Sequence, residues 1–260
     1  ENEDLGFKIE SVSDTSGSDL QHTINKTMMR VDLPEPLNPG ESYTFEVKWN
    51  YFINNRSTDR ARSGFEFFEG DGNYLYTITQ FYPRLAVYDD VNGWQNKQFL
   101  GRGEFALCFG DFEVEMTVPA DHVVAATGTL QNPDEVLTAK QLELLEKSRT
   151  SKDPVIIISQ NEAEENEKSS SQDTKTWRFK AENVRDFAWT SSRKFIWDAM
   201  GVDLNGRTVM AMSYYPKEAN PLYEKYSTRV VAHTLKFYSD YTFDYPYPKA
   251  ISVEANNGME

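Results

Sequence analysis

Cysteine and histidine are both scarce in this sequence. Cys108 is the only cysteine among 260 residues, and a single cysteine excludes a disulfide framework and a zinc ribbon. It lies in the apolar stretch FALCF, which favours a small buried hydrophobe over a reactive thiol. The three histidines are His22, His122 and His233, and none has a second histidine four residues further on.

Basic residues are outnumbered, and long apolar runs are missing. The 27 Lys and Arg residues face 41 Asp and Glu residues, giving a formal net charge of −14. This balance disfavours nucleic acid and anionic membrane surfaces as partners, because both attract basic patches. We find no transmembrane segment and no signal-peptide pattern. The first residues run directly into a strand pattern, so we expect the sequence to begin inside a domain.

Aromatic residues are abundant, at 13%, and several of them alternate with polar residues. In residues 43–51 the aromatic and apolar side chains occupy every second position, and residues 111–118 repeat this pattern with Phe112, Val114, Met116 and Val118. Alternation with period two indicates a half-buried β-strand. A further strand is predicted at 175–179, with Trp177 and Phe179 on one face. These patterns predict an antiparallel, mainly β fold.

Helices are predicted at two places, of which the first follows Leu130. Asn132, Pro133 and Glu135 form a helix-start signature, and we expect a helix over 133–147. The polar residues 160–174 have no periodicity and are predicted to form a loop.

The sequence of residues 206–254 predicts a strand–helix–strand unit. A strand over 206–216 precedes a helix opened by Asn220 and Pro221, and the strand AISVE follows at 250–254. We expect His233 to be a buried core histidine rather than a metal ligand. The helix is predicted to bury one face, made of Leu222, Tyr226, Val230, His233, Phe237 and Tyr241.

The sequence of residues 80–128 resembles that of the M1 family of zinc aminopeptidases, in the form common among Bacteroidetes-type bacteria. The likeness is carried by Gln80-Phe81-Tyr82-Pro83-Arg84, Tyr88-Asp89-Asp90, Gly93-Trp94, Gly103-Glu104-Phe105 and Gly110-Asp111-Phe112. Residues 184–192 and the final Gly258-Met259-Glu260 extend it. The resemblance implies a saddle- or sandwich-like N-terminal β domain over 1–189. It also implies that 190–260 open a thermolysin-like catalytic domain, with the boundary near Thr190.

The resemblance also implies a zinc cofactor, which this sequence has no residues to hold. Zinc peptidases of this kind use two histidines one helical turn apart with a glutamate between them, and no such pair occurs here. In the family this motif follows the Gly-Met-Glu motif, so we expect the sequence to stop before it. The expected result is a fragment that binds no zinc and is inactive alone, within a protein that removes N-terminal residues from peptides.

Substrate binding is implied for five residues. The Gly-Met-Glu motif matches Gly258, Met259 and Glu260, and its carboxylate would hold the free α-amino group of a peptide. By family position Gln80 or Tyr82 would supply a second polar contact. The family has glycine where this sequence has Asn257, which tolerates the same positive φ.

Other catalytic patterns are missing. No nucleophile elbow, phosphate-binding loop or dinucleotide fingerprint occurs. Asp89 and Asp90 are adjacent and would point to opposite faces of a strand, so a turn is favoured over a general acid–base pair. A β-sandwich that binds or docks a partner without catalysis is the alternative function.

Overall fold

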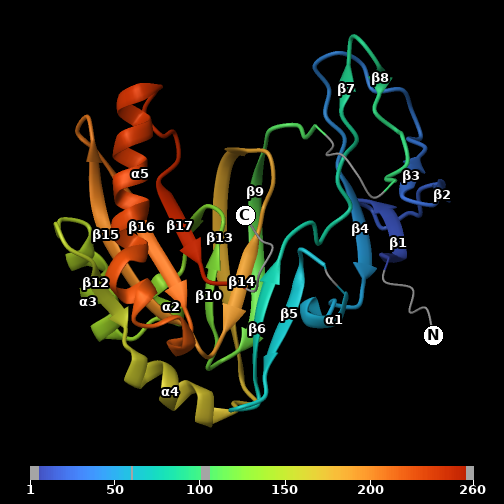
Figure 1. Cartoon of the computed structure of the whole chain (residues 1–260). Helices are drawn as coiled ribbons and strands as arrows, with labels where there is room; N and C mark the ends of the chain where they lie inside the picture. The colour runs from blue at the N-terminus through green and yellow to red at the C-terminus, as the bar shows by residue number, and fades with distance from the viewer. Residues whose placement is uncertain (1–5, 60, 101–105, 256–260) are drawn as a thin grey trace. The chain divides into compact units, whose positions relative to one another are not determined.

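The computed structural model describes residues 6–59, 61–100 and 106–255 (Figure 1). Strands make up 39% of the structure and helices 21%, which confirms the mainly β, antiparallel class. The chain forms two compact units. The first comprises Glu1–Asn54 with Tyr82–Cys108, and the second comprises Asn55–Phe81 with Phe109–Glu260.

The first unit consists of short antiparallel pairs. A strand is confirmed within the predicted range 43–51 and covers Phe45–Asn50. Its Val47 and Trp49 are half-buried and Lys48 between them is exposed, while Phe45 on the predicted inner face is also exposed, at 39%. Asp89 Oδ1 accepts hydrogen bonds from the backbone N–H groups of Val91 and Asn92, so the Asp89 side chain closes the turn that follows its short strand. The pairs are β1 (Lys8–Asp14) with β4 (Phe45–Asn50), β2 (His22–Asn25) with β3 (Met28–Val31), and β7 (Tyr88–Asp89) with β8 (Gly93–Trp94).

The second unit contains two antiparallel sheets. A short helix, α1 (Arg56–Asp59), precedes them. One sheet has the order β10–β14–β6–β5 and the other the order β11–β13–β9. Phe112 and Val114 are half-buried in β9, Met116 and Val118 are buried, and the residues between them are exposed, so the predicted alternation is confirmed. The strands are β5 (Gly64–Phe68), β6 (Asn73–Ile78), β9 (Gly110–Pro119), β10 (Val123–Ala126), β11 (Thr129–Leu130), β13 (Thr174–Val184) and β14 (Trp189–Ser192).

A third sheet of the second unit has the order β12–β15–β16–β17. Its strands are β12 (Val155–Ile158), β15 (Ile196–Leu204), β16 (Arg207–Tyr215) and β17 (Lys249–Val253). The first three are antiparallel, while β17 is parallel to β16. The connection between β16 and β17 contains a 3-10 turn (Lys217–Ala219), a π-helical turn (Tyr223–Ser227) and α5 (Thr228–Tyr241), which packs on β15 and β16 (Figure 1).

The predicted helix at 133–147 is two helices, α2 (Pro133–Val136) and α3 (Ala139–Ser148). Asn132 does not cap α2; its side chain donates to the backbone oxygen of Thr176 and accepts from the N–H of Arg178, so it ties the helix to β13. Thr138 interrupts the helix because it forms a capping box with Gln141, which starts a new helix.

The predicted loop at 160–174 was wrong for most of its length. Residues Gln160–Ser169 form α4, and β13 begins at Thr174. Ser159 and Glu162 form a capping box at the start of α4, a signal that the high charge of the segment concealed. The helix buries Ala163 and Glu167, so its buried face contains only two residues.

The predicted buried face of the last helix was also wrong. Val230 is 58% exposed, Phe237 46% and Tyr241 76%, and His233 is exposed beside the ring of Phe237. A second stripe of smaller residues, with Leu235 at its centre, packs on the sheet instead. The exposed stripe begins with Leu222 and Tyr226 before the helix and continues on α5. It is called here the outer face of α5 and consists of Leu222, Tyr226, Val230, Phe237, Tyr238 and Tyr241.

Cys108 is exposed rather than buried, because it precedes β9, which begins at Gly110. Its neighbour Phe109 is 53% exposed, so neither of these two residues enters the core. None of the helices in the described ranges is both long enough and apolar enough to cross a bilayer.

A buried lysine joins three parts of the second unit. The Lys194 side chain is 0% exposed, and its ammonium forms ion pairs with Asp71, Glu167 and Glu218. Its Nζ lies 3.0 Å from Glu167 Oε1 and 3.0 Å from Glu218 Oε1, and 4.5 Å from the centre of the Phe68 ring. Burial opposes the charge, but the three hydrogen bonds outweigh burial and raise the pKa of Lys194.

We expect Lys194→Met to lower the free energy of unfolding by up to about 3–5 kcal/mol, because it removes the buried cation from the buried Glu167 carboxylate and leaves it only the partly exposed Lys217. Urea denaturation measures this change. The control is Lys168→Met, which removes the exposed pair between Lys168 and Glu165 on α4 and should leave the free energy of unfolding nearly unchanged. Equal effects of the two substitutions would contradict a central role for Lys194.

Candidate functional site

The residues predicted to bind substrate do not meet in one described site. Gly258, Met259 and Glu260 lie outside the described residues. Gln80 is exposed just after β6, with a φ of 53°. Tyr82 is half-buried and belongs to the first compact unit, whereas Gln80 belongs to the second. The roles of these five residues stay predictions.

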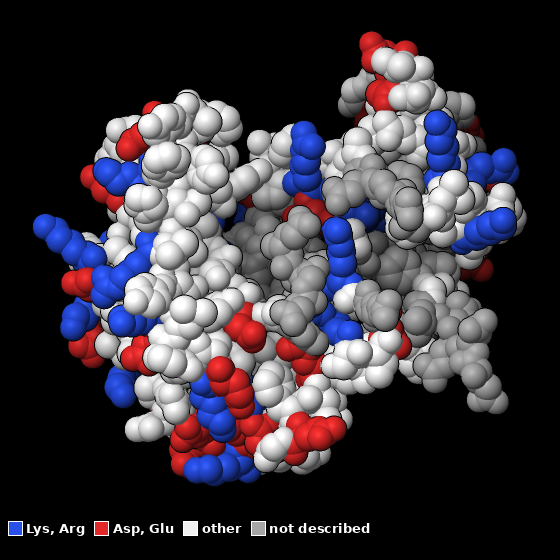
Figure 2. Space-filling model, viewed as in Figure 1, with Lys and Arg blue, Asp and Glu red and all other residues white. Residues whose placement is uncertain are grey.

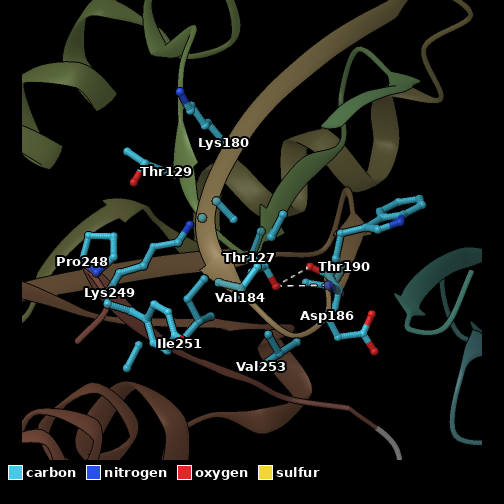
Figure 3. Close-up of a pocket in the computed structure, with 18 of the residues that line it drawn as sticks. Thr127, Thr129, Lys180, Val184, Asp186, Thr190, Pro248, Lys249, Ile251 and Val253 are labelled. Atoms are coloured by element: carbon cyan, nitrogen blue, oxygen red, sulfur yellow. Dashed lines mark hydrogen bonds between the residues drawn. The ribbon is translucent and has the colours of Figure 1, made fainter. Parts of the chain in front are cut away.

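A pocket of about 970 Å³ lies within the second unit. Its walls come from the ends of β6 and β10, from β11, from the last residues of β13, from β14 and from β17 (Figure 3). All three sheets of the unit contribute to it. A cavity of this size is in the range of small-molecule sites, so we take it as the candidate functional site.

The pocket borders the segments on which the sequence prediction rests. Thr79 lines it and directly precedes Gln80. Ala255 lines it too, five positions before Glu260. The two strands followed by predicted substrate-binding residues, β6 and β17, therefore open onto one pocket.

Thr127 and Gly128, which connect β10 to β11 in the pocket wall, make close contacts with Ala188 and with β13. Thr127 Oγ1 accepts a hydrogen bond from the N–H of Ala188 at 3.1 Å and donates to the oxygen of Ala188 at 3.3 Å (Figure 3). Gly128 has a φ of 79°, and a Cβ there would collide with the backbone oxygen of Lys180. Glycine at this position lets the turn approach β13 directly.

Two lysines of the pocket differ in environment. Lys180 pairs with Glu182 at 3.3 Å and with Glu113 at 3.7 Å, and its hydrogen bond to Glu182 raises the pKa of Lys180. Lys249 lies at the start of β17, and burial lowers its pKa to about 7. The residue as a whole is half-buried, and it borders the pocket.

A histidine–serine contact lies outside the pocket lining. His122 Nδ1 is 2.8 Å from Ser191 Oγ, and the two residues are 6% and 1% exposed. Burial and the nearby Arg193 lower the pKa of His122 to about 4, although Asp121 opposes the shift. Because substrate has no access to the pair, the contact is structural and does not make Ser191 a nucleophile.

The described residues do not fit a zinc site. Within residues 6–59, 61–100 and 106–255, no group of three or more His, Cys, Asp or Glu side chains is placed to hold a metal ion. Sequence reasoning missed Lys249, because it began the final strand one residue later. The signal was a lysine placed directly between the turn-forming Pro248 and an apolar strand.

Comparisons with known proteins give matches only among solved structures. No family model matches the sequence, and no curated protein matches it. The M1 zinc metallopeptidase from Deinococcus radiodurans matches with a TM-score of 0.53 and 17% identity, over 96% of this chain and 46% of that chain. The chain has the fold of part of an M1 zinc metallopeptidase.

Two further structures show the same M1-type fold. A mutant of the Deinococcus radiodurans enzyme bound to the substrate Tyr-Ser-Ala has a TM-score of 0.52 at 16% identity, over 96% of this chain and 46% of that chain. A mutant two-domain M1 zinc metallopeptidase bound to L-tryptophan has a TM-score of 0.53 at 16% identity, over 96% and 47%. This chain thus spans about half the length of the structures that it matches.

The buried His122 predicts a loss of stability in acid. Its pKa is about 4 when folded and about 6.5 when unfolded, so below pH 6.5 the unfolded chain binds a proton that the folded chain does not. The stability is complete above pH 6.5 and is lost as the pH falls towards 4. By pH 4.5 the loss amounts to about 2–3 kcal/mol.

Urea denaturation at pH 7.5 and pH 4.5 measures this dependence. In His122→Gln the difference in unfolding free energy between the two pH values should shrink by about 2–3 kcal/mol. His22→Gln is the control, because His22 is exposed, and it should keep the wild-type difference. An unchanged pH dependence in His122→Gln would contradict the assignment to His122.

Proposed function

We propose that this chain is the N-terminal β domain and the opening of the catalytic domain of an M1-family zinc aminopeptidase. The observation that carries the proposal is the M1-type fold over 96% of the chain. At 17% identity this likeness concerns the fold, so the activity rests on further features of the chain.

The first such feature is the position of the sequence motifs. The strands β6 and β17 line one pocket and are followed in sequence by Gln80 and by Gly258-Met259-Glu260. In the proposed enzyme, the Glu260 carboxylate binds the protonated N-terminus of a peptide, with Gln80 or Tyr82 as the second polar contact. Holding the N-terminus places the first peptide bond at the reacting centre, as an exopeptidase requires.

The second feature is the outer face of α5, which is exposed to solvent among the described residues. Its large apolar side chains are between 46% and 76% exposed, and the surface over α5 is largely free of charge in Figure 2. A second groove, of about 450 Å³, lies between α5 and the segment that contains β17. Apolar surface of this kind is typical of an interface, and we assign it to the remainder of the catalytic domain.

In the proposed enzyme, zinc would be bound by residues other than those that the structure describes. When bound, a catalytic zinc ion polarises the scissile carbonyl and activates water. The described residues have no set of ligands for it. The chain's own contribution is to bind and orient the substrate, and zinc binding is assigned to the remainder of the protein.

The proposal predicts the effect of Glu260→Gln in the intact protein. An ammonium–carboxylate hydrogen bond contributes roughly 1.5–3 kcal/mol, so kcat/KM for aminoacyl-naphthylamides should fall about tenfold or more. N-acetylated peptides should be little affected, because they carry no ammonium group.

Glu143→Gln on α3 is the matched control, because Glu143 is exposed and outside the pocket. It should keep wild-type kcat/KM. Wild-type efficiency in Glu260→Gln on free-amino substrates would exclude Glu260 as the anchor. An intact protein with neither zinc nor turnover would favour the non-catalytic binding or docking module.

The 260-residue chain by itself is expected to retain no stoichiometric zinc and to hydrolyse no aminoacyl-naphthylamide, because its sequence lacks the paired histidines of a zinc peptidase. Metal analysis after dialysis and the same assay test this. Stoichiometric zinc together with turnover would show that the chain contains an active site elsewhere.

A further inference from the structure

The pocket in the second unit contains the amine of Lys249, which has no counter-ion among the described residues. The Lys249 side chain extends from the start of β17 among the residues that line the pocket (Figure 3). Within the part of the chain that the structure describes, no carboxylate forms an ion pair with it. Its Nζ instead lies 4.9 Å from the centre of the Phe179 ring, which is 3% exposed.

The other lysine of the pocket provides an internal comparison. Lys180 also lines the pocket, but its side chain is 42% exposed and pairs with Glu113 and Glu182. Its pKa is raised, whereas that of Lys249 is lowered to about 7. At pH 7 about half of Lys249 is therefore the neutral amine, compared with about one molecule in 2,500 for an ordinary lysine.

The remaining charges of the pocket balance. Lys180 and Arg185 contribute positive charge, and Glu182 and Asp186 contribute negative charge. The lining beside Lys249 is apolar, with Ile251 and Val253 on β17 and Val184 at the end of β13 (Figure 3). The pocket therefore suits a ligand with an uncharged, apolar body rather than a phosphate or a carboxylate.

We propose that this pocket is a binding site for a small apolar aldehyde, which Lys249 holds as an imine. The lone pair on Nζ attacks the carbonyl carbon and forms a C–N bond. Two protons pass from nitrogen to the carbonyl oxygen, which leaves as water, so the step needs no oxidant or reductant. The site lies in the same pocket that the proposed substrate-binding residues border, but the imine chemistry needs no zinc and no peptidase activity.

The test uses the intact protein, with benzaldehyde as the probe and cyanoborohydride to trap the imine as a benzylamine. Peptide mapping by mass spectrometry at pH 7 follows each lysine. We expect the peptide containing Lys249 to be benzylated at least tenfold faster than the one containing Lys180. Its rate should level off as the benzaldehyde concentration rises, because the aldehyde binds before it reacts.

Three variants separate the possible explanations. Lys249→Met should abolish the fast labelling, while Lys180→Arg should keep it. Thr129→Trp adds a large side chain to an exposed residue of the pocket wall, and it should remove the saturation while leaving Lys249 in place. Circular dichroism verifies that each variant is folded.

Two results would overturn the proposal. Labelling of Lys249 no faster than that of Lys180 would show that its amine is ordinary or inaccessible in the intact protein. Fast labelling that stays linear with benzaldehyde concentration, and is unaffected by Thr129→Trp, would show a reactive amine without a binding site.

Discussion

The second unit depends on one buried positive charge. Lys194 lies in the connection between β14 and β15, which belong to two different sheets, and the ion pairs at its ammonium tie three other segments to this connection. Asp71 brings in the turn between β5 and β6, Glu167 brings in α4, and Glu218 brings in the 3-10 turn after β16. A buried ammonium is tolerated only where several acceptors converge on it, so these four segments must fold together.

Local sequence patterns predicted the strands well and the helices less well. The alternation in β9 was visible because one face is buried and the other is in water along its whole length. In α4 only Ala163 and Glu167 are buried, so periodicity was too weak to show a helix. The sequence of α5 contains two apolar stripes, and periodicity alone does not determine which of them packs on the sheet. In the structure the stripe around Leu235 packs there, and the larger, mostly aromatic stripe is exposed.

The candidate site could be predicted only in part, because some of its properties depend on contacts between residues that are far apart in the sequence. The resemblance placed Gln80 and Glu260 after strands that do border one pocket. The low pKa of Lys249 arises from burial in the folded chain, and its ring contact, Phe179, is 70 residues away in sequence. The partners of Lys194 are 24 to 123 residues away. Long-range contacts of this kind leave no local signal in the sequence.

The parallel pairing of β17 has a consequence for the order in which the fold forms. β17 joins β16 only after the chain has crossed back through residues 216–248, and closing such a long connection is slow. Until then the amine of Lys249 is in water and keeps its proton up to about pH 10.4. Once closed, it is held at a pKa of about 7. Closure between these pH values therefore releases a proton, and rising pH favours the completed sheet.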